Sequence, residues 1–334
     1  MGVKQRLKQG LYSFDPVFDS AYRTLFRGDR GTLRAICLHA VSPSGSSAAS
    51  TTLPPGLVST LDDLRVLIES FLKHDYSFIT PHNLLTDLAP SKRYVMITFD
   101  DGYFSTHLAV ELFKEYNLPL TICVSPYYLM EQKAYWSDAF HRHYRQHHPT
   151  LGPDYGQVHA QLRRTTQRER EAFLIESYGA AALEPIGDAD RPLTLAELKH
   201  LHAGGNVEVG NHTMTHAALD ALTTSQATEE LLEAQRVLAS TLGNPPTTIA
   251  YPYGYYNNDT APLCKELGFQ IALTTQNTVQ SLSDLRSGGL YQVARFGNWG
   301  KKRSLDRQLM MMRSNFVFSE AVTSARLRIR SAQS

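Results

Sequence analysis

One stretch constrains the fold of this chain more than any other: a largely apolar run that ends in two carboxylates and a glycine. Residues 95–99 read Val-Met-Ile-Thr-Phe, and such a continuous run is typical of a parallel strand that is buried on both faces. Asp100, Asp101 and Gly102 follow directly. The carboxylates are therefore expected at the carboxyl end of a strand, where α/β sheets and barrels place their chemistry. The alternative is an ordinary turn or helix cap, because Asp and Gly are common turn residues.

Two adjacent carboxylates at such a point repel each other, and burying them is costly unless a positive charge lies beside them. A metal ion is the simplest source of that charge. One aspartate would bind the ion, and the other would remain free to accept a proton.

Composition narrows the class of protein. The chain has 334 residues, of which 42% are hydrophobic, so it can form a large core as one or two domains. Its formal net charge of +1 argues against nucleic acid as a partner. No apolar run is long enough for a transmembrane segment, and no signal peptide is seen at the N-terminus. The three cysteines are expected to be buried free thiols, so we expect a cytoplasmic protein, with peripheral membrane association through the basic tail left open.

Strand-like and helix-like segments alternate along most of the chain. The expected strands are residues 32–39, 76–81, 94–99, 120–125, 206–210, 247–250, 269–273 and 291–296. This alternation predicts an α/β fold, specifically a deformed (β/α) barrel of seven to eight strands. The expected parts are an N-terminal helical extension at 1–31 with a helix at 16–26, the barrel at 32–300, a helical insertion at about 128–190, and a basic helical tail at 301–334.

Polar residues recur where the expected strands end. They are His39, Asp100, Asp101, Ser125, His212, His216, Tyr251, Tyr253 and Arg295. His212 and His216 would share one face if their segment were helical. Two imidazoles and one carboxylate leave positions on a metal for water and substrate, as a catalytic site requires. Either histidine alone is more often an ordinary core or surface residue. A zincin is disfavoured because Thr213, not Glu, follows His212.

Three motifs carry a resemblance to a known family. Residues 98–102 (Thr-Phe-Asp-Asp-Gly), 210–216 (Gly-Asn-His-Thr-Met-Thr-His) and 251–254 (Tyr-Pro-Tyr-Gly) resemble, in order, the first three motifs of the polysaccharide deacetylases, the NodB-like carbohydrate esterases. The resemblance covers roughly residues 32–299. It implies a metal-dependent hydrolase that removes acetyl groups from N-acetylated sugars, on a deformed (β/α) barrel.

The resemblance also implies roles for single residues. Asp101, His212 and His216 would hold a divalent metal, with Zn²⁺ preferred and Co²⁺ or Ni²⁺ as alternatives, and Asp100 would be the general base. The implied lining of the substrate groove is Tyr251, Pro252, Tyr253 and Gly254, with the Tyr253 backbone amide at the oxyanion. We add Arg295 and Trp299, which follow from their place at and after the last expected strand, as candidate substrate-binding residues.

Two departures from the family pattern bear on these roles. Ala250 stands where the third motif usually has an arginine, and Arg295 is the candidate replacement from the last strand. The late Leu-x-His that carries the general acid is missing, but the first strand ends in Leu38-His39. That order resembles the poly-N-acetylglucosamine deacetylases, in which this strand comes first and His39 would be the acid. A buried structural histidine is the alternative for His39.

Two other functions remain as alternatives. A non-haem iron oxygenase also uses two histidines and a carboxylate, but its His-x-Asp spacing is absent here. A catalytically degenerate barrel would bind carbohydrate through Tyr251, Tyr253, Trp136 and Trp299, although these aromatics are more often core or rim residues. The substrate is expected to be an N-acetylated sugar, polysaccharide or glycolipid precursor. The sequence does not name it, and it does not give the oligomeric state.

Overall fold

The computed structural model describes residues 30–45, 53–54, 56–148 and 151–297. The expected helix at 16–26, the basic tail and Trp299 lie outside these residues. Within the described part, no helix combines the length and apolar character that crossing a membrane requires.

A parallel sheet forms the centre of the molecule. Its six main strands are β1 (Thr32–Leu38), β5 (Arg93–Phe99), β6 (Leu120–Val124), β7 (Val207–Asn211), β8 (Thr248–Ala250) and β9 (Ile271–Leu273), paired in that order. The longest pairing runs from Thr32 opposite Arg93 to Leu38 opposite Phe99, between β1 and β5. β4 (Tyr76–Phe78) pairs with the first half of β5. The continuous apolar runs follow from burial on both faces, since side chains of β1 and β5 contribute to two separate core clusters.

The sheet curves until its edges nearly meet. β11 (Arg295–Phe296) pairs with β1 in parallel, with Ala35 opposite Arg295, and Val293 just before it bridges to Leu273 of β9. β10 (Gln280–Ser281) adds an antiparallel contact to β1. The prediction of a deformed (β/α) barrel is confirmed. The strand expected at 291–296 is too long, because a 3₁₀ turn, η6 (Gly289–Gln292), occupies its first two residues and β11 only its last two.

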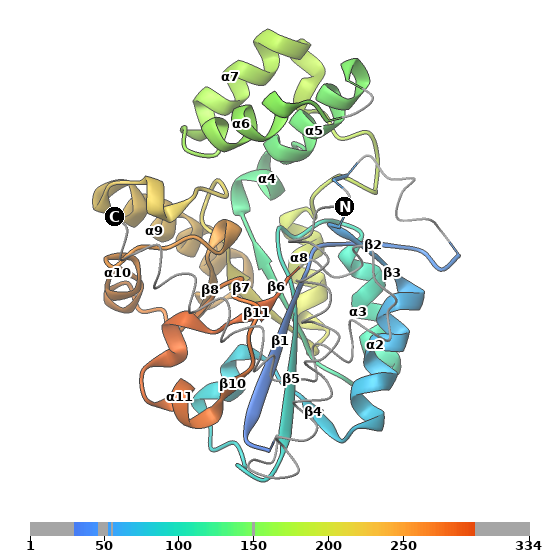
Figure 1. Cartoon of the computed structure of the whole chain (residues 1–334), viewed down its shortest axis with the longest axis vertical. Helices are drawn as coiled ribbons and strands as arrows, with labels where there is room; N and C mark the ends of the chain where they lie inside the picture. The colour runs from blue at the N-terminus through green and yellow to red at the C-terminus, as the bar shows by residue number, and fades with distance from the viewer. Residues whose placement is uncertain (1–29, 46–52, 55, 149–150, 298–334) are drawn as a thin grey trace, which may run out of the picture.

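Helices cover the outside of the barrel. They are α2 (Leu61–Lys73), α3 (Thr106–Glu115), α8 (Leu195–Ala203), α9 (Thr224–Leu242), α10 (Thr260–Glu266) and α11 (Leu282–Arg286), with 3₁₀ turns η2 (Pro81–Leu85), η4 (Leu219–Ala221) and η5 (Pro252–Gly254). Helices α2 and α3 lie on one side of β1 and β5, and α9 and α10 lie on the other (Figure 1). Thr60 caps the amino terminus of α2, because its hydroxyl accepts from Asp63 N at 3.0 Å. Ser105 takes the cap position of α3 but gives no capping bond, since its hydroxyl instead accepts from Val41 N.

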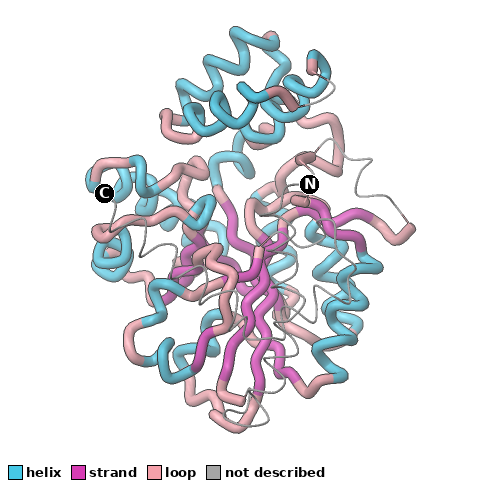
Figure 2. Tube along the Cα trace, in the orientation of Figure 1, coloured by secondary structure: helices cyan, strands magenta, loops and turns pink. Residues whose placement is uncertain are grey.

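The insertion forms a separate helical lobe. It comprises α4 (Pro126–Glu131), α5 (Trp136–His147), α6 (Pro153–Leu162), α7 (Gln167–Tyr178) and η3 (Ala180–Leu183). The lobe stands beyond the carboxyl end of β6 (Figures 1 and 2). It has its own core around Trp136 and Phe140, and a buried ion pair of 2.8 Å joins Arg142 to Asp190 where the chain returns to the barrel. The predicted helical insertion is confirmed.

Two short strands follow β1. β2 (Ala40–Ser42) and β3 (Val58–Thr60) pair in parallel as a small separate sheet. This pairing holds the chain that follows β1 beside the amino terminus of α2.

Candidate active site

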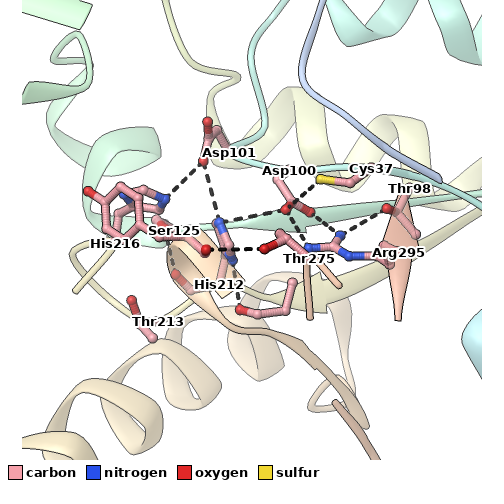
Figure 3. A network of polar contacts seen from close by, with 12 residues as sticks. Cys37, Thr98, Asp100, Asp101, Ser125, His212, Thr213, His216, Thr275 and Arg295 are labelled. Atoms are coloured by element: carbon pink, nitrogen blue, oxygen red, sulfur yellow. Dashed lines mark hydrogen bonds and ion pairs between the residues drawn. The ribbon is translucent and has the colours of Figure 1, made fainter. Parts of the chain in front are cut away.

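Four strand ends bring the chemistry-bearing residues together. Leu38, the last residue of β1, is followed by His39; β5 is followed by Asp100 and Asp101; β7 is followed by His212; and β11 begins with Arg295. These segments are far apart in the sequence, and the parallel sheet brings them to one edge (Figure 3). His39, Asp100, Asp101 and His212 lie at the carboxyl ends of strands as expected, whereas Arg295 begins its strand and reaches the site from opposite Ala35 of β1.

Asp101, His212 and His216 form a compact buried group. The Oδ1 atom of Asp101 lies 3.5 Å from Nε2 of His212 and 3.4 Å from Nε2 of His216. One ligand atom from each residue lies within 4.8 Å of the others, and all three side chains are buried. The dashed lines from Asp101 to both imidazoles show this convergence in Figure 3.

The group fits a divalent metal. Oδ1 of Asp101 is buried and has no hydrogen-bond partner among the described residues, although a buried carboxylate oxygen normally has one. Ligands at about 2.0–2.1 Å in a tetrahedral arrangement lie roughly 3.3 Å from each other, close to the 3.4 and 3.5 Å seen here. Two imidazole nitrogens and one carboxylate oxygen suit zinc and its neighbours in the first transition series.

Both histidines direct Nε2 towards the carboxylate of Asp101. Nδ1 of His212 lies 2.7 Å from the backbone oxygen of Ala250, which directs Nε2 towards the carboxylates. Burial lowers the pKa of His216 to about 3, so this imidazole is neutral at neutral pH. Burial also disfavours charge on His212, but the nearby Asp100 and Asp101 outweigh it and raise the pKa of that ring.

The two histidines lie on a loop, not on a helix as their spacing suggested. β7 ends at Asn211, whose side chain accepts from the backbone N of Thr213 at 2.7 Å. Thr213 and His216 have φ angles of 61° and 56°, in the left-handed region that few non-glycine residues adopt. The hydroxyl of Thr213 then accepts from Ala217 N at 2.9 Å. The left-handed backbone at Thr213 and His216 therefore lets this loop direct both imidazole rings towards Asp101.

Asp100 is paired with Arg295 rather than with the histidines. Nη1 and Nη2 of Arg295 donate to the two carboxylate oxygens at 2.7 Å each, and both side chains are buried. Arg295 also donates to Thr98 Oγ1 and to the backbone oxygen of Thr274. Burial alone would raise the pKa of Asp100, but the guanidinium outweighs it and holds the pKa well below its usual range. The sequence placed Arg295 in the substrate groove, whereas the structure places it behind Asp100, with no exposed surface.

His39 lies beside Asp100 at the end of β1. Its ring, the thiol of Cys37 and the carboxylate of Asp100 have atoms within 4.8 Å of one another. The thiol donates to Asp100 Oδ2 at 3.2 Å. His39 is half-buried, unlike the fully enclosed ring expected of a structural core histidine. Its role as general acid stays a prediction.

The residues of the third motif, 251–254, divide between the hydrophobic core and the active site. Tyr251 is fully buried and donates to the backbone oxygen of Tyr291, and Pro252 is also buried, so these two side chains belong to the core and do not line a groove. Tyr253 is half-buried, and its ring centre lies 4.6 Å from that of His216. Gly254 has a φ of 73°, and a Cβ there would lie 2.0 Å from Thr275 Oγ1. Only glycine fits this turn, which holds Tyr253 against His216.

The insertion supplies residues that the sequence did not point to as site residues. Tyr135 donates to the backbone oxygen of Asp101 at 2.5 Å, and Tyr103 donates to Asp138 of α5 at 2.6 Å. Trp136, considered above as a sugar-binding aromatic, is 1% exposed and donates to the hydroxyl of Tyr253 at 3.2 Å. The adjacent aromatic residues Tyr135 and Trp136 at the start of α5 were the available signal, but a sequence pattern does not identify the residues they contact.

Comparisons with known proteins agree with this arrangement. Residues 87–272 match the family described as polysaccharide deacetylase. The putative polysaccharide deacetylase YxkH of Bacillus subtilis (strain 168) is 23% identical over 250 residues, which span 71% of this chain and 67% of that protein. The match to the family omits β1 and β11, the two strands that bring His39 and Arg295 to the site.

Solved structures share the fold at low sequence identity. The deacetylase PplD of Streptococcus pyogenes, in complex with acetate, superposes with a TM-score of 0.55 at 19% identity, over 85% of this chain and 99% of that one. IcaB of Ammonifex degensii gives a TM-score of 0.56 at 17% identity, over 85% and 98%.

Proposed function

The chain belongs to the polysaccharide deacetylase family, and from this premise we propose that it is a metal-dependent hydrolase that removes the acetyl group from an N-acetylated sugar. It is a carbohydrate deacetylase by family; the metal, the residue roles and the form of the substrate are the proposal. The observation that carries it is the buried Oδ1 of Asp101, which has no hydrogen-bond partner in the described part of the chain and faces two imidazole nitrogens.

Asp101, His212 and His216 would hold the ion, with Zn²⁺ preferred and Co²⁺ or Ni²⁺ as alternatives. A bound divalent ion supplies Lewis acidity, which polarises an amide carbonyl and brings the pKa of a water molecule down to about 7. Tyr135 fixes the position of Asp101 through its backbone oxygen, and Ala250 fixes the orientation of His212. The ligands are thus held before any ion binds.

Asp100 accepts the proton of the attacking water. Its lowered pKa keeps it ionised throughout the neutral range, so it is always able to accept, although it is a weak base. Each carboxylate oxygen has two lone pairs, and among the side chains that the structure describes only Arg295 donates to Oδ1, so Asp100 keeps capacity to accept a proton. Arg295 thereby orients Asp100 without contacting the substrate.

The water oxygen bonds to the acetyl carbon, and the oxyanion that forms is expected at the backbone amide of Tyr253. When the carbon–nitrogen bond breaks, the leaving amine needs a proton, because an amide anion is too basic to depart. His39 lies on the Asp100 side of the site and donates that proton as an imidazolium. The products are acetate and a free amino sugar.

The substrate is an N-acetylated sugar, carried in a polysaccharide or in a glycolipid precursor. The half-buried ring of Tyr253 lies next to His216 and offers an apolar face to a sugar ring near the metal ligands.

Metal content tests the proposal without a choice of substrate. The wild-type protein and the His212→Ala/His216→Ala variant are purified without added metal or histidine tags, offered Zn²⁺, and assayed for bound metal. Near one equivalent in the wild type and little in the variant supports the site and is followed by assays of acetate release from N-acetylated sugars. Equal, near-zero metal in both proteins refutes the metal-dependent mechanism.

A further inference from the structure

The helical insertion contacts three loops of the active site. Tyr135 donates to the backbone oxygen of Asp101, and Trp136 donates to the hydroxyl of Tyr253. Arg170 of α7 directs Nη2 towards the backbone oxygen of Thr215, at 3.5 Å. In Figure 1 the lobe of α5–α7 lies beyond the carboxyl ends of the strands.

Arg170 is unusual among these contacts because its charge is buried. Its side chain is 1% exposed, and its Nε and Nη1 atoms have no hydrogen-bond partner among the residues that the structure describes. The guanidinium carbon lies 5.5 Å from the ring centre of Trp136. A buried cation with so few bonds is costly, so a nearby negative charge is needed to offset it.

Glu230 of α9 supplies that charge at the same residue of the histidine loop. Its carboxylate accepts from the backbone N of Thr215 at 2.9 Å and from the Thr215 hydroxyl at 2.7 Å. Burial raises the pKa of Glu230, and the bonds from Thr215 and the charge of Arg170 oppose this rise. Both backbone polar groups of Thr215 are therefore held, the N–H by the carboxylate of Glu230 and the oxygen by the guanidinium of Arg170.

Thr215 is the point at which the histidine loop most needs support. It directly precedes His216, and Thr213 and His216 both have positive φ angles, which non-glycine residues adopt only when their surroundings hold them there. We propose that Arg170 of the insertion, acting with Glu230 across Thr215, is a positioning residue that sets the place of His216 in the metal site. The inference deepens the proposed function and rests on its metal site.

The test measures metal affinity and not activity alone. Zinc dissociation constants are determined by competition with a chromophoric chelator for the wild type, Arg170→Met, Arg170→Lys and Arg168→Met. Arg170→Met keeps most of the side-chain volume and removes the charge, so we expect zinc affinity to fall by about 10–100-fold, as for other residues that support metal ligands. Arg170→Lys keeps the charge and should restore part of the loss. Arg168→Met, exposed on the same helix, should stay within twofold of the wild type.

The outcomes separate the two proposals. A wild-type protein that binds no zinc refutes the metal site and this inference with it. A wild type that binds zinc, with Arg170→Met within twofold of it, refutes the inference alone, even if the metal-free variant melts at a lower temperature. If Arg170→Met does not fold, Glu230→Gln replaces it: this variant keeps an oxygen for Thr215 and loses the charge, and unchanged zinc affinity there overturns the proposal.

Discussion

Replacing Arg295 with methionine removes the partner of a buried carboxylate. In the wild type, Asp100 is 3% exposed and both of its oxygens accept from the guanidinium at 2.7 Å. In Arg295→Met, the remaining neighbours are the weak thiol donor of Cys37 at 3.2 Å and His212 Nε2 at 4.0 Å. Breaking a buried pair in this way lowers the free energy of unfolding by about 3–5 kcal/mol, which changes the unfolding equilibrium constant by roughly two to four powers of ten.

The loss should depend on pH in a defined direction. In the wild type, the folded-state pKa of Asp100 lies below that of the unfolded chain, which is about 3.9. The pair therefore contributes its full stability above about pH 4 and loses it as the pH falls through the folded-state pKa. Without Arg295, burial raises the pKa of Asp100, so the carboxyl takes up a proton as the pH falls from neutral. The difference between the two proteins should be largest near pH 7.5 and smallest near pH 4.

Urea unfolding of metal-free protein, followed by tryptophan fluorescence, measures the loss. The matched control is Arg295→Met/Asp100→Asn, which has neither charge and should recover much of the stability at pH 7.5. A loss below about 1 kcal/mol in the single variant contradicts the argument from breaking a buried ion pair. A double variant as unstable as the single one contradicts it too, because the damage would then come from lost packing.

Three further changes test other parts of the site. His39→Ala should keep its metal and lower kcat by about 10²–10⁴-fold, as expected for a general acid; unchanged turnover would remove it from that role. Gly254→Ala should lower the free energy of unfolding by about 2 kcal/mol or more, because its φ is 73° and the new Cβ would lie 2.0 Å from Thr275 Oγ1. Adding Thr275→Ala should restore part of that loss, as measured by thermal melts. Burial raises the pKa of Asp138 to about 7, so the folded state holds a proton that the unfolded chain releases near pH 4. The free energy of unfolding of the wild type should therefore fall as the pH rises from about 4 to 7. Asp138→Asn, whose oxygen can still accept from Tyr103, should lack that slope, and parallel stability curves for the two proteins would refute the assignment.

Local patterns in the sequence were sufficient where a feature depends on neighbours along the chain. The continuous apolar run predicts the buried strand at 93–99, and the strand in turn places the two aspartates that follow it at its carboxyl end. The start of α2 follows from the capping box at Thr60. The same reasoning failed at 212–216, because a spacing of four brings two side chains together in a helix and also in a loop with two left-handed residues. Hydrophobic pattern does not distinguish these cases.

Contacts between segments that are distant in the chain could not be predicted from sequence patterns. Arg295 was expected near the site because it ends a strand, but its pairing with Asp100 depends on how β11 docks against β1. Tyr251 looked like a groove residue from its motif, and only the packing of β8 shows that it is in the core. Arg170 gave no signal at all, since a lone arginine in a charged helix is usually solvated.

Because β1 near the start of the chain pairs with β11 near its end, the active site is completed only late in synthesis. Asp100 leaves the ribosome 195 residues before Arg295, so a nascent chain contains Asp100 and the three residues proposed to bind the metal before it contains the cation that pairs with Asp100. Until β11 docks, the barrel lacks the strand that pairs with β1 beside β9, and Asp100 lacks its ion-pair partner. The last strand therefore closes the barrel and balances the charge of Asp100 in the same event, and chains that end before β11 keep an unpaired Asp100.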